Sequence, residues 1–478
     1  MTEVRYSPLL TDLYQLTMLA GYFEKDMHLR PAVFDLYFRK NPFHGSYAVF
    51  AGLQTALDYL SGLRFGDADL EYLESLGIFN RPFLDYLGNF SFHARVIAPP
   101  EGTVVFGGEP LVTVEGRLAE VQLVETALLN IINFQTLIAT KAARICVAAA
   151  PGQVIEFGLR RAQGPDGGLH GTRAAYIGGA RGTSNVWAGQ IFGIPVKGTH
   201  AHSWIMSFDD ELSAFRAYAD CFPEHCILLV DTYDTLKSGI PNAITVAREL
   251  RSKGHELLGV RLDSGDLAYL SKISRQILDE AGFPQVKIVA SSDLDETIIE
   301  SIRSEGGRVD IYGVGTKLAT GSGPGGCALG GVYKLVRCDG QPKLKVTSDL
   351  AKATLPDRKR LLRVSGADGQ FLMDIICRQQ DEVVTGDQVY NPANPDESKT
   401  IPQGATLQEI RQPVMDEGQL LQKKENLDLM ADRCVEQLQR LPKGTLRLAN
   451  PHIYKVAISS KLLNLRNRLV KQYLDQLE

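Results

Sequence analysis

Six short apolar runs, each ending in small or polar residues, recur between residues 154 and 316. Their sequences are VIEFG (154–158), IPVKGT (194–199), ILLVDT (227–232), LLGVRLD (257–263), VKIVASS (286–292) and DIYGVGT (310–316). Each run is continuous rather than alternating, which is typical of a strand covered on both faces. The pattern therefore predicts six buried parallel strands.

Amphipathic segments separate most of these runs. Apolar residues stand three and four positions apart, with charges opposite, in DDELSAFRAYADCF (209–222), IPNAITVARELRSKG (240–254), LAYLSKISRQILDEAG (267–282) and DETIIESIRSEGG (295–307). Helices of this kind return the chain for the next parallel strand. The alternation predicts an α/β barrel, in which the chemistry lies at the C-terminal ends of the strands.

The remainder of the chain is less regular. Residues 1–120 mix helical and strand patterns and predict a separate N-terminal α+β domain. A long helix over roughly 120–150 leads into the barrel, so that we place the barrel with its linking helix at 121–330. Residues 331–478 predict new strands followed by a helical C-terminal region of about sixty residues.

Composition narrows the class of protein. The chain has 478 residues, 44% of them hydrophobic, and a net charge of −5, so it is globular and carries no global charge that would favour nucleic acid. We find no apolar run of the ~18 residues that cross a bilayer and no signal-peptide pattern, and we expect a cytoplasmic protein without membrane partners. Seven cysteines without a CxxC pair indicate a reducing compartment and no structural zinc.

Cationic and hydroxyl side chains follow the first predicted strand. Arg160 and Arg161 are adjacent, so at most one of them points into the barrel mouth. A guanidinium there suits a carboxylate, a phosphate or an aromatic ring, although pairing with a neighbouring Glu is an equally simple explanation. Gly182, Thr183 and Ser184 resemble a helix N-terminus with hydroxyl caps, which binds anions or serves only as a cap.

Two histidines follow the second predicted strand. His200 and His202 share a face if the strand continues, and such a pair also occurs in metal hydrolases. A metal site needs further histidines at the same mouth, and the sequence places none there. One of the pair is therefore interpreted as a nucleophile or general base, with a purely structural histidine as the alternative.

Acids and small residues follow the later strands. Asp231, Asp263 and Asp266 are suited to ribose hydroxyls or to Mg²⁺ bound through water, and Asp266 is the best placed of them to cap the following helix. Ser291–Asp293 and Gly313–Thr316 are suited to a phosphate approached by backbone amides, although tight turns would also use them. These residues together predict chemistry on a phosphorylated sugar or a nucleotide. A metal-dependent hydrolase using His200 and His202, and a non-catalytic binder, stay open.

Seven ordered motifs resemble the nicotinate phosphoribosyltransferase family: TDLYQLTM, FDLYFRKNP, FGLRRAQGPDGG, GTSNVWAG, GTHAHSW, VRLDSGDL and YGVGTKL, between residues 6 and 335. The resemblance implies an irregular, incomplete α/β barrel with a flanking α/β domain that the post-barrel strands (331–478) complete. It also implies formation of nicotinate mononucleotide and pyrophosphate from nicotinate and 5-phosphoribosyl 1-pyrophosphate, coupled to ATP hydrolysis with Mg²⁺, by a homodimer with shared active sites.

The resemblance also implies roles for individual residues. His202 would be phosphorylated, Arg160 would meet the pyridine ring or its carboxylate, and Arg261 and Asp263 would contact the ribosyl donor. Tyr14 would stack on the ring from the neighbouring subunit, and Arg39 would lie on the polyphosphate side. Gly315 and Thr316 would bind the 5-phosphate, with Phe157, Thr199, Ser291 and Ser292 also lining the substrates.

Ser184 is the residue that we expect to set the preference between nicotinate and nicotinamide. Related nicotinamide enzymes carry Asp at this position, which accepts from a carboxamide and repels a carboxylate, so Ser184 favours the acid. A nicotinamide-preferring transferase of the same fold is the nearest alternative.

Overall fold

The computed structural model describes residues 6–345 and 354–475. The chain forms two compact units. The second unit, Ile138–Cys327, is one continuous piece, and the first combines the chain up to Leu137 with the chain from Ala328 onward. The first unit is therefore assembled from the two segments that flank the second.

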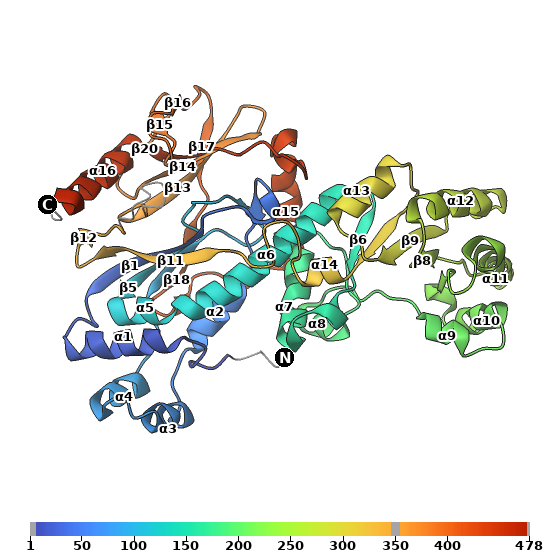
Figure 1. Ribbon diagram of the computed structural model, residues 1–478, viewed down its shortest axis with the longest axis horizontal. Helices are drawn as coiled ribbons and strands as arrows, with labels where there is room; N and C mark the ends of the chain where they lie inside the picture. Colours follow the sequence, from blue (N-terminus) through green and yellow to red (C-terminus); the bar gives the residue numbers. More distant parts are fainter. Residues whose placement is uncertain (1–5, 346–353, 476–478) are drawn as a thin grey trace. The chain divides into compact units, whose positions relative to one another are not determined.

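The second unit is built on a five-stranded parallel sheet (Figure 1). Its order is β6-β10-β9-β8-β7, and every pairing in it is parallel. The strands are β6 (Gln153–Glu156), β7 (Ile227–Leu229), β8 (Gly259–Leu262), β9 (Lys287–Ser292) and β10 (Ile311–Val314). Four of them lie within one of the apolar runs, and β6 begins one residue before its run. The predicted α/β class is confirmed.

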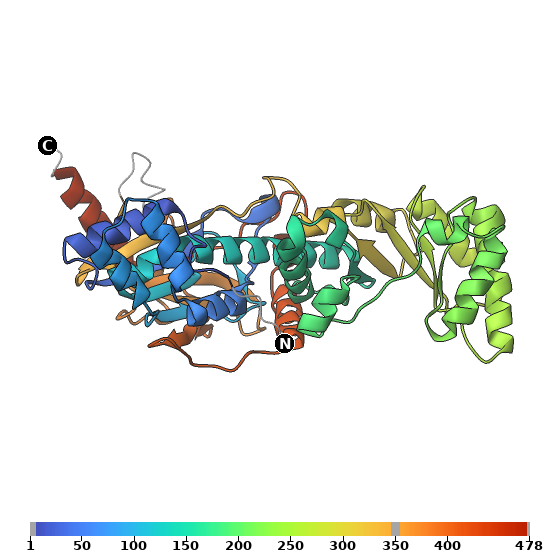
Figure 2. The same cartoon turned by 90° about the horizontal axis from the view of Figure 1, so that it is seen from below.

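Helices alternate with these strands and run alongside the sheet, as the yellow-green part of Figure 2 shows. They are α7 (Gly164–Ile177), α8 (Val186–Phe192), α9 (His202–Met206), α10 (Glu211–Cys221), α11 (Ile240–Ser252), α12 (Leu267–Glu280), α13 (Glu296–Ser304) and α14 (Thr316–Ala319). The four predicted amphipathic segments contain α10 to α13. Asp266 caps α12 by accepting from the Tyr269 amide at 2.9 Å, as predicted.

The prediction of a sixth strand at 194–199 was wrong. Thr183 forms isolated parallel bridges to Glu156 on one side and to Val196 on the other. Beyond β6 the sheet therefore continues only as single bridges and not as a further strand. Pro195 has no amide hydrogen to donate, and Val196 is 47% exposed at this open edge. The barrel is therefore incomplete.

Two local expectations next to this edge were also wrong. Arg160 and Arg161 lie in a 3₁₀ turn, Leu159–Arg161, instead of on a strand. The cap of α8 is Asn185, which accepts from the Ala188 amide at 3.2 Å, rather than the preceding hydroxyls. Thr183 is buried instead, where its hydroxyl donates to Glu156 at 2.6 Å.

The first unit contains a seven-stranded sheet in the order β12-β11-β1-β5-β3-β18-β19. Its strands are β1 (Pro31–Phe38), β3 (Arg95–Ala98), β5 (Val112–Arg117), β11 (Gly331–Cys338), β12 (Gln341–Pro342), β18 (Gln412–Asp416) and β19 (Gln419–Leu420). Strand β11 pairs antiparallel with β1, placing Phe34 opposite Leu335. Both segments of the unit thus contribute to one sheet.

Helices cover one face of this sheet (Figure 1). Phe34, Leu36 and Phe38 on β1 join the main hydrophobic core there. The helices are α1 (Leu13–Glu24), α2 (Leu53–Gly62), α3 (Asp67–Ser75), α4 (Arg81–Gly88), α5 (Leu118–Leu123) and the start of α6 (Glu125–Ala149). A separate two-stranded antiparallel sheet pairs β2 (Ala48–Val49) with β4 (Val104–Val105).

A six-stranded sheet in the order β16-β15-β20-β14-β13-β17 completes the first unit. Its strands are β13 (Lys359–Ser365), β14 (Phe371–Arg378), β15 (Gln388–Tyr390), β16 (Ser398–Thr400), β17 (Thr406–Glu409) and β20 (Val456–Ser459). Helix α16 (Ser460–Asp475) packs on it through Leu462 and Leu463, and α15 (Leu427–Gln439) precedes β20. The C-terminal region is therefore partly strand as well as helix.

Helix α6 is long and apolar enough to cross a membrane by length and composition alone. The expectation that no apolar segment is long enough to cross a bilayer overlooked this helix. However, 78% of its most apolar window is buried inside the protein, which is how the core helix of a globular fold behaves.

Candidate active site

Polar side chains meet at the C-terminal ends of β7, β8 and β9. Asp263, just after β8, accepts a hydrogen bond from the Ser291 hydroxyl on β9. Its other oxygen lies 3.6 Å from Nε2 of His202. Three of the predicted site residues are therefore brought together at one edge of the parallel sheet, where barrel enzymes build their sites.

His202 is the first residue of α9 and does not extend a strand. Its Nδ1 lies 3.0 Å from the Thr232 hydroxyl, and its side chain is 40% exposed. A carboxylate beside Nε2 favours the tautomer with hydrogen on Nε2, which leaves the Nδ1 lone pair facing Thr232. Thr232 was not among the predicted site residues, although a hydroxyl directly after the strand-end Asp231 was a usable signal.

Asp231 holds the loop that carries Asp263. Its Oδ2 accepts from the Asp263 amide at 2.9 Å and from the Ser264 hydroxyl at 2.6 Å. Its Oδ1 is buried without a hydrogen-bond partner among the described residues. This orphaned oxygen leaves Asp231 able to accept one more donor or a hard cation.

Arg261 supplies a guanidinium next to these acids. Burial lowers its pKa, while the carboxylates of Asp263 and Asp231 oppose that effect and the nearby charge of Arg160 adds to it. The turn after β6 thus brings Arg160 into the electrostatic range of Arg261. Two guanidinium groups near paired acids create a site for an anionic ligand that also presents hydroxyls.

His200 has a different environment from His202, so the two do not share a face. It is buried, its Nε2 accepts from the Leu229 amide at 3.3 Å, and burial lowers the pKa of its ring to about 4. The His200 ring is therefore neutral, and its Nε2 is already engaged by the backbone amide of Leu229. Among the residues described, no group of three or more His, Cys, Asp or Glu side chains is arranged to hold a metal ion. A hydrolase that used His200 as a metal ligand would first have to break its bond to the Leu229 amide.

At the end of β10, the Phe157 ring lies close against the backbone of Gly313. A Cβ on Gly313 would lie 2.5 Å from the Phe157 ring, so only glycine fits beside that ring. Gly315 has φ −110° and ψ −100° and precedes Thr316, the first residue of α14. Gly315 and Thr316 thus lie where β10 passes into α14, and their binding of a phosphate stays a prediction.

The remaining candidates of the second unit lie at the end of β9 or on connecting segments. Ser292 ends β9 with φ 127°, a conformation that L-residues rarely adopt. Ser184 is exposed, and its amide donates to the Glu156 carbonyl at 3.0 Å. The Thr199 hydroxyl lies 3.4 Å from the His200 carbonyl.

Tyr14 and Arg39 belong to the first unit. Tyr14 lies on α1 and is 48% exposed, and Arg39 directly follows β1. Their association with the second unit of a neighbouring subunit stays a prediction.

The fold and the strand-end cluster are typical of α/β-barrel enzymes, which build their sites at the C-terminal edge of the sheet. Family models describe the chain almost throughout: the nicotinate phosphoribosyltransferase N-terminal domain matches residues 9–133, the family model 152–391, and the C-terminal domain 358–466. The chain belongs to the nicotinate phosphoribosyltransferase family.

Individual relatives agree over nearly the whole chain. Nicotinate phosphoribosyltransferase of Bacillus subtilis is 41% identical over 456 residues, covering 94% of this chain and 92% of the relative. The human enzyme is 36% identical, covering 97% of this chain and 96% of its own. The crystal structure of human nicotinic acid phosphoribosyltransferase superposes with a TM-score of 0.85 at 34% identity, over 96% of this chain and 100% of the human one.

Proposed function

We propose that this protein joins nicotinate to the ribosyl group of 5-phosphoribosyl 1-pyrophosphate, releasing pyrophosphate, and couples this reaction to ATP hydrolysis in NAD salvage. The observation that carries the proposal is the contact of His202 with Asp263 at the strand ends of a chain that belongs to this family. A cytoplasmic location is part of the proposal, as expected from the sequence.

The ribosyl transfer builds positive charge on the ribose ring and negative charge on the departing pyrophosphate. Asp263 would contact the ribose and stabilise the cationic ring, and Arg261 would neutralise phosphate oxygens. Backbone amides at Gly315 and Thr316 would bind the 5-phosphate. The nicotinate nitrogen attacks the anomeric carbon, the bond to pyrophosphate breaks, and no proton is transferred.

Arg160 and Ser184 would select the base. The guanidinium of Arg160 would meet the nicotinate carboxylate, and Phe157 and Thr199 would border the ring. Ser184 is exposed and neutral, so it presents no carboxylate against the substrate's own.

His202 would carry the coupling to ATP. Nδ1, the ring nitrogen without hydrogen, would release the Thr232 hydroxyl, attack the γ-phosphorus and displace ADP, and Asp263 beside Nε2 would stabilise the charge that develops on the ring. Water later cleaves the phosphohistidine. The side chain is sufficiently exposed to receive a nucleotide, and Thr232 orients it from the other side.

Mg²⁺ fits the residues present. Asp263 is the acid assigned to the ribosyl donor, and the free Oδ1 of Asp231 adds a second hard oxygen, whereas Asp266 is committed to the helix cap. One or two carboxylates with substrate phosphates are typical of a Mg²⁺ site. When bound, the ion would shield the charge of the pyrophosphate leaving group.

A homodimer would complete the site. Tyr14 would stack on the pyridine ring and Arg39 would meet the polyphosphate, each contributed by the neighbouring subunit. Tyr14 is exposed on α1, so its ring is available to a partner.

The direct test supplies purified protein with nicotinate, the ribosyl donor and Mg²⁺, with and without ATP, and separates the products by chromatography. We expect nicotinate mononucleotide that increases with ATP, together with ADP. Absence of the mononucleotide under both conditions would refute the proposed activity.

A further inference from the structure

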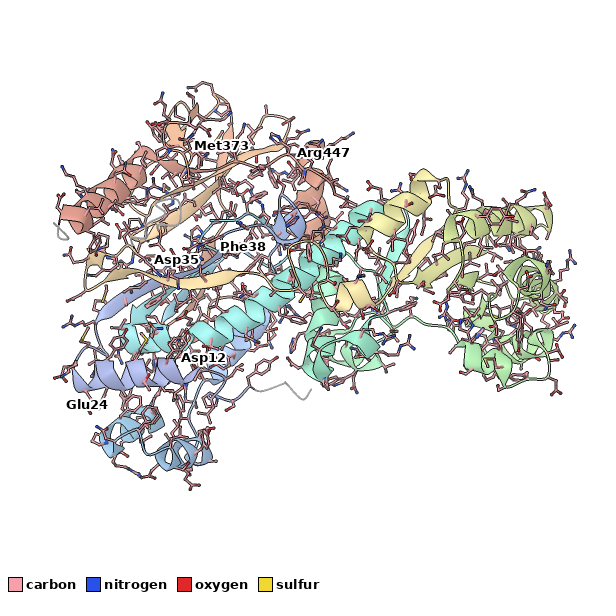
Figure 3. The ribbon with its side chains drawn as sticks, in the orientation of Figure 1. Asp12, Glu24, Asp35, Phe38, Met373 and Arg447 are labelled. Atoms are coloured by element: carbon pink, nitrogen blue, oxygen red, sulfur yellow. The ribbon has the colours of Figure 1, made fainter. Side chains whose placement is uncertain are left out.

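A buried carboxylate stands at the end of β6, directly before the turn that carries Arg160, and the proposed reaction gives it no part. Glu156 is the last residue of the strand and is only 3% exposed. Its side chain contacts α7, and Figure 3 draws the side chains of both elements as sticks on the ribbon. A buried carboxylate is costly unless its oxygens are hydrogen-bonded, so its partners indicate what it holds in place.

Three donors from three different segments face the Glu156 carboxylate. Its Oε1 accepts from the backbone amide of Gly158, in the turn that follows β6. Its Oε2 accepts from the Thr172 hydroxyl on α7 at 3.0 Å and from the Thr183 hydroxyl at 2.6 Å. One side chain therefore joins the turn after β6, helix α7 and the segment that precedes α8.

The backbone of Glu156 binds the segment before α8 as well. Its amide donates to the Gly182 carbonyl at 2.9 Å, and its carbonyl accepts from the Ser184 amide at 3.0 Å. The hydroxyl of fully buried Thr183 also accepts from the Asn185 amide at 2.9 Å. Ser184 is exposed between these two buried neighbours, so its place depends on how they are held.

The turn on the other side of Glu156 is equally confined. A Cβ on Gly158 would lie 2.3 Å from the Cβ of Ala319 and 2.8 Å from the Gly315 carbonyl, so the turn is packed against the start of α14. The Phe157 amide donates to the last carbonyl of β10 at 2.8 Å. Gly158 is the N-cap of the 3₁₀ turn that contains Arg160. The position of Arg160 is therefore fixed through Gly158.

We propose that Glu156 is a positioning residue that sets the separation between Arg160 and Ser184 and thereby fits the site to nicotinate. The inference rests on the proposed function, in which these two residues select the base. Glu156 itself would not touch the base, because it is buried and both of its carboxylate oxygens are engaged. Preorganisation of this kind requires the contacting side chains to be held within about 0.5 Å of the productive geometry.

Thr183 gives access to this link without removing the carboxylate. Replacing Glu156 by alanine would strand three donors in the interior, which is a cost to the whole fold. Thr183→Val instead keeps the shape of the side chain and deletes only the hydroxyl that donates to Glu156. Thr183→Ser keeps that hydroxyl and should restore the function that the valine variant loses.

Ser271→Ala is the matched control in the same unit. The Ser271 hydroxyl is also fully buried, donates to the Ala268 carbonyl at 3.1 Å and accepts from the Arg308 amide at 3.0 Å. It therefore makes one donated and one accepted hydrogen bond, as the Thr183 hydroxyl does, but on α12 and away from both base-selecting residues.

The test is calorimetric titration of the full-length protein, in Mg²⁺, with nicotinate and separately with the ribosyl donor. We expect Thr183→Val to bind nicotinate roughly tenfold more weakly, because small displacements of a positioning group cost factors of this size or larger. Its affinity for the ribosyl donor, whose proposed contacts lie on other strands, should stay within about twofold. Thr183→Ser and Ser271→Ala should bind both ligands within about threefold of wild type. In turnover, Thr183→Val should raise the KM for nicotinate and leave kcat nearly unchanged.

Nicotinate affinity of Thr183→Val within about twofold of wild type would overturn the inference. An equal loss for the ribosyl donor would also overturn it, since a general loss of structure would then explain both. The same holds if Ser271→Ala loses nicotinate affinity as strongly as Thr183→Val. Wild type that binds nicotinate but forms no mononucleotide would refute the proposed activity alone, because the comparison of affinities requires no turnover.

Discussion

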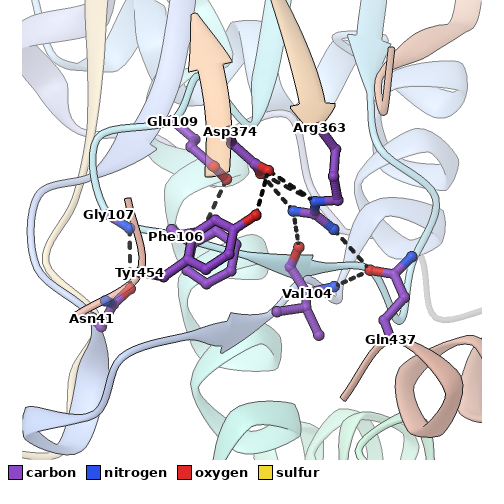
Figure 4. A network of polar contacts seen from close by, with 9 residues as sticks. All are labelled: Asn41, Val104, Phe106, Gly107, Glu109, Arg363, Asp374, Gln437 and Tyr454. Carbon is purple, nitrogen blue, oxygen red and sulfur yellow. Dashed lines mark hydrogen bonds and ion pairs between the residues drawn. The ribbon is translucent and has the colours of Figure 1, made fainter. Parts of the chain in front are cut away.

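Arg363 on β13 is the centre of the buried network in Figure 4, and its removal should be costly. Its guanidinium contacts Asp374 at 2.6 Å and 3.0 Å, and both side chains are at most 3% exposed. It also donates to the Val104 carbonyl at 2.8 Å and to Gln437 at 3.0 Å. Four of its hydrogen bonds thus hold β4, β14 and α15 together.

Arg363→Met keeps the volume of the side chain but leaves the Asp374 carboxylate buried beside Glu109. Removing one partner of a buried ion pair costs about 3–5 kcal/mol. Two lost hydrogen bonds add about 1 kcal/mol each, and the packing of the methionine returns part of this. We therefore expect the free energy of unfolding to fall by about 4 kcal/mol.

Urea unfolding followed by far-UV circular dichroism measures this loss. The double variant Arg363→Met/Asp374→Asn removes the stranded charge while keeping a partner for Tyr454, and it should regain about 2 kcal/mol of the loss. Arg81→Met removes an exposed, ion-paired arginine of the same unit and should change stability by less than about 0.5 kcal/mol. A loss below about 1 kcal/mol in the single variant, or a double variant no more stable than the single one, would refute this reasoning.

Further predictions concern both units. His202→Ala should abolish ATP stimulation and the phosphoprotein while leaving the circular dichroism spectrum intact; ATP stimulation at the wild-type level would contradict its role. Ser184→Asp should shift the preference from nicotinate towards nicotinamide by about tenfold or more in kcat/KM, as one introduced charge repulsion implies; an unchanged ratio would remove Ser184 from base selection. Burial, followed by the charge of Asp374, raises the pKa of Glu109 well above 4.5, so its stabilising contribution is complete below pH 4.5 and is lost as the pH rises through the raised pKa. Glu109→Gln should therefore gain stability relative to wild type above that window and not below it, measured as urea midpoints against pH. Gly313→Ala places a methyl 2.5 Å from the Phe157 ring and should lower kcat/KM for nicotinate by displacing that ring, whereas wild-type kinetics would show that the ring adapts.

Much of the second unit could be predicted from the sequence, because buried parallel strands are continuous apolar runs and their ends carry the site. The runs around Leu228, Val260 and Ile288 became strands in this way. The run 194–199 had the same appearance, but Pro195 and an exposed edge prevent a ladder, and hydrophobic pattern alone does not report the absence of a neighbouring strand.

The contacts of individual side chains were harder to predict from the sequence. His202 begins a helix, so its neighbour Thr232 could not be inferred from strand alternation. Arg363 bonds to Val104 across 259 positions of sequence, and no local pattern encodes such a pairing. Glu156 accepts from Thr183 across 27 positions, in a segment that forms only isolated bridges, and periodicity does not specify such a contact.

The most direct test of the proposed function is a competition assay. Equimolar nicotinate and nicotinamide are supplied with the ribosyl donor and Mg²⁺, with and without ATP, and both mononucleotides and ADP are quantified by chromatography. The account predicts nicotinate mononucleotide in large excess, increased by ATP and accompanied by ADP. Nicotinamide mononucleotide as the main product, or a yield of nicotinate mononucleotide indifferent to ATP, would contradict it.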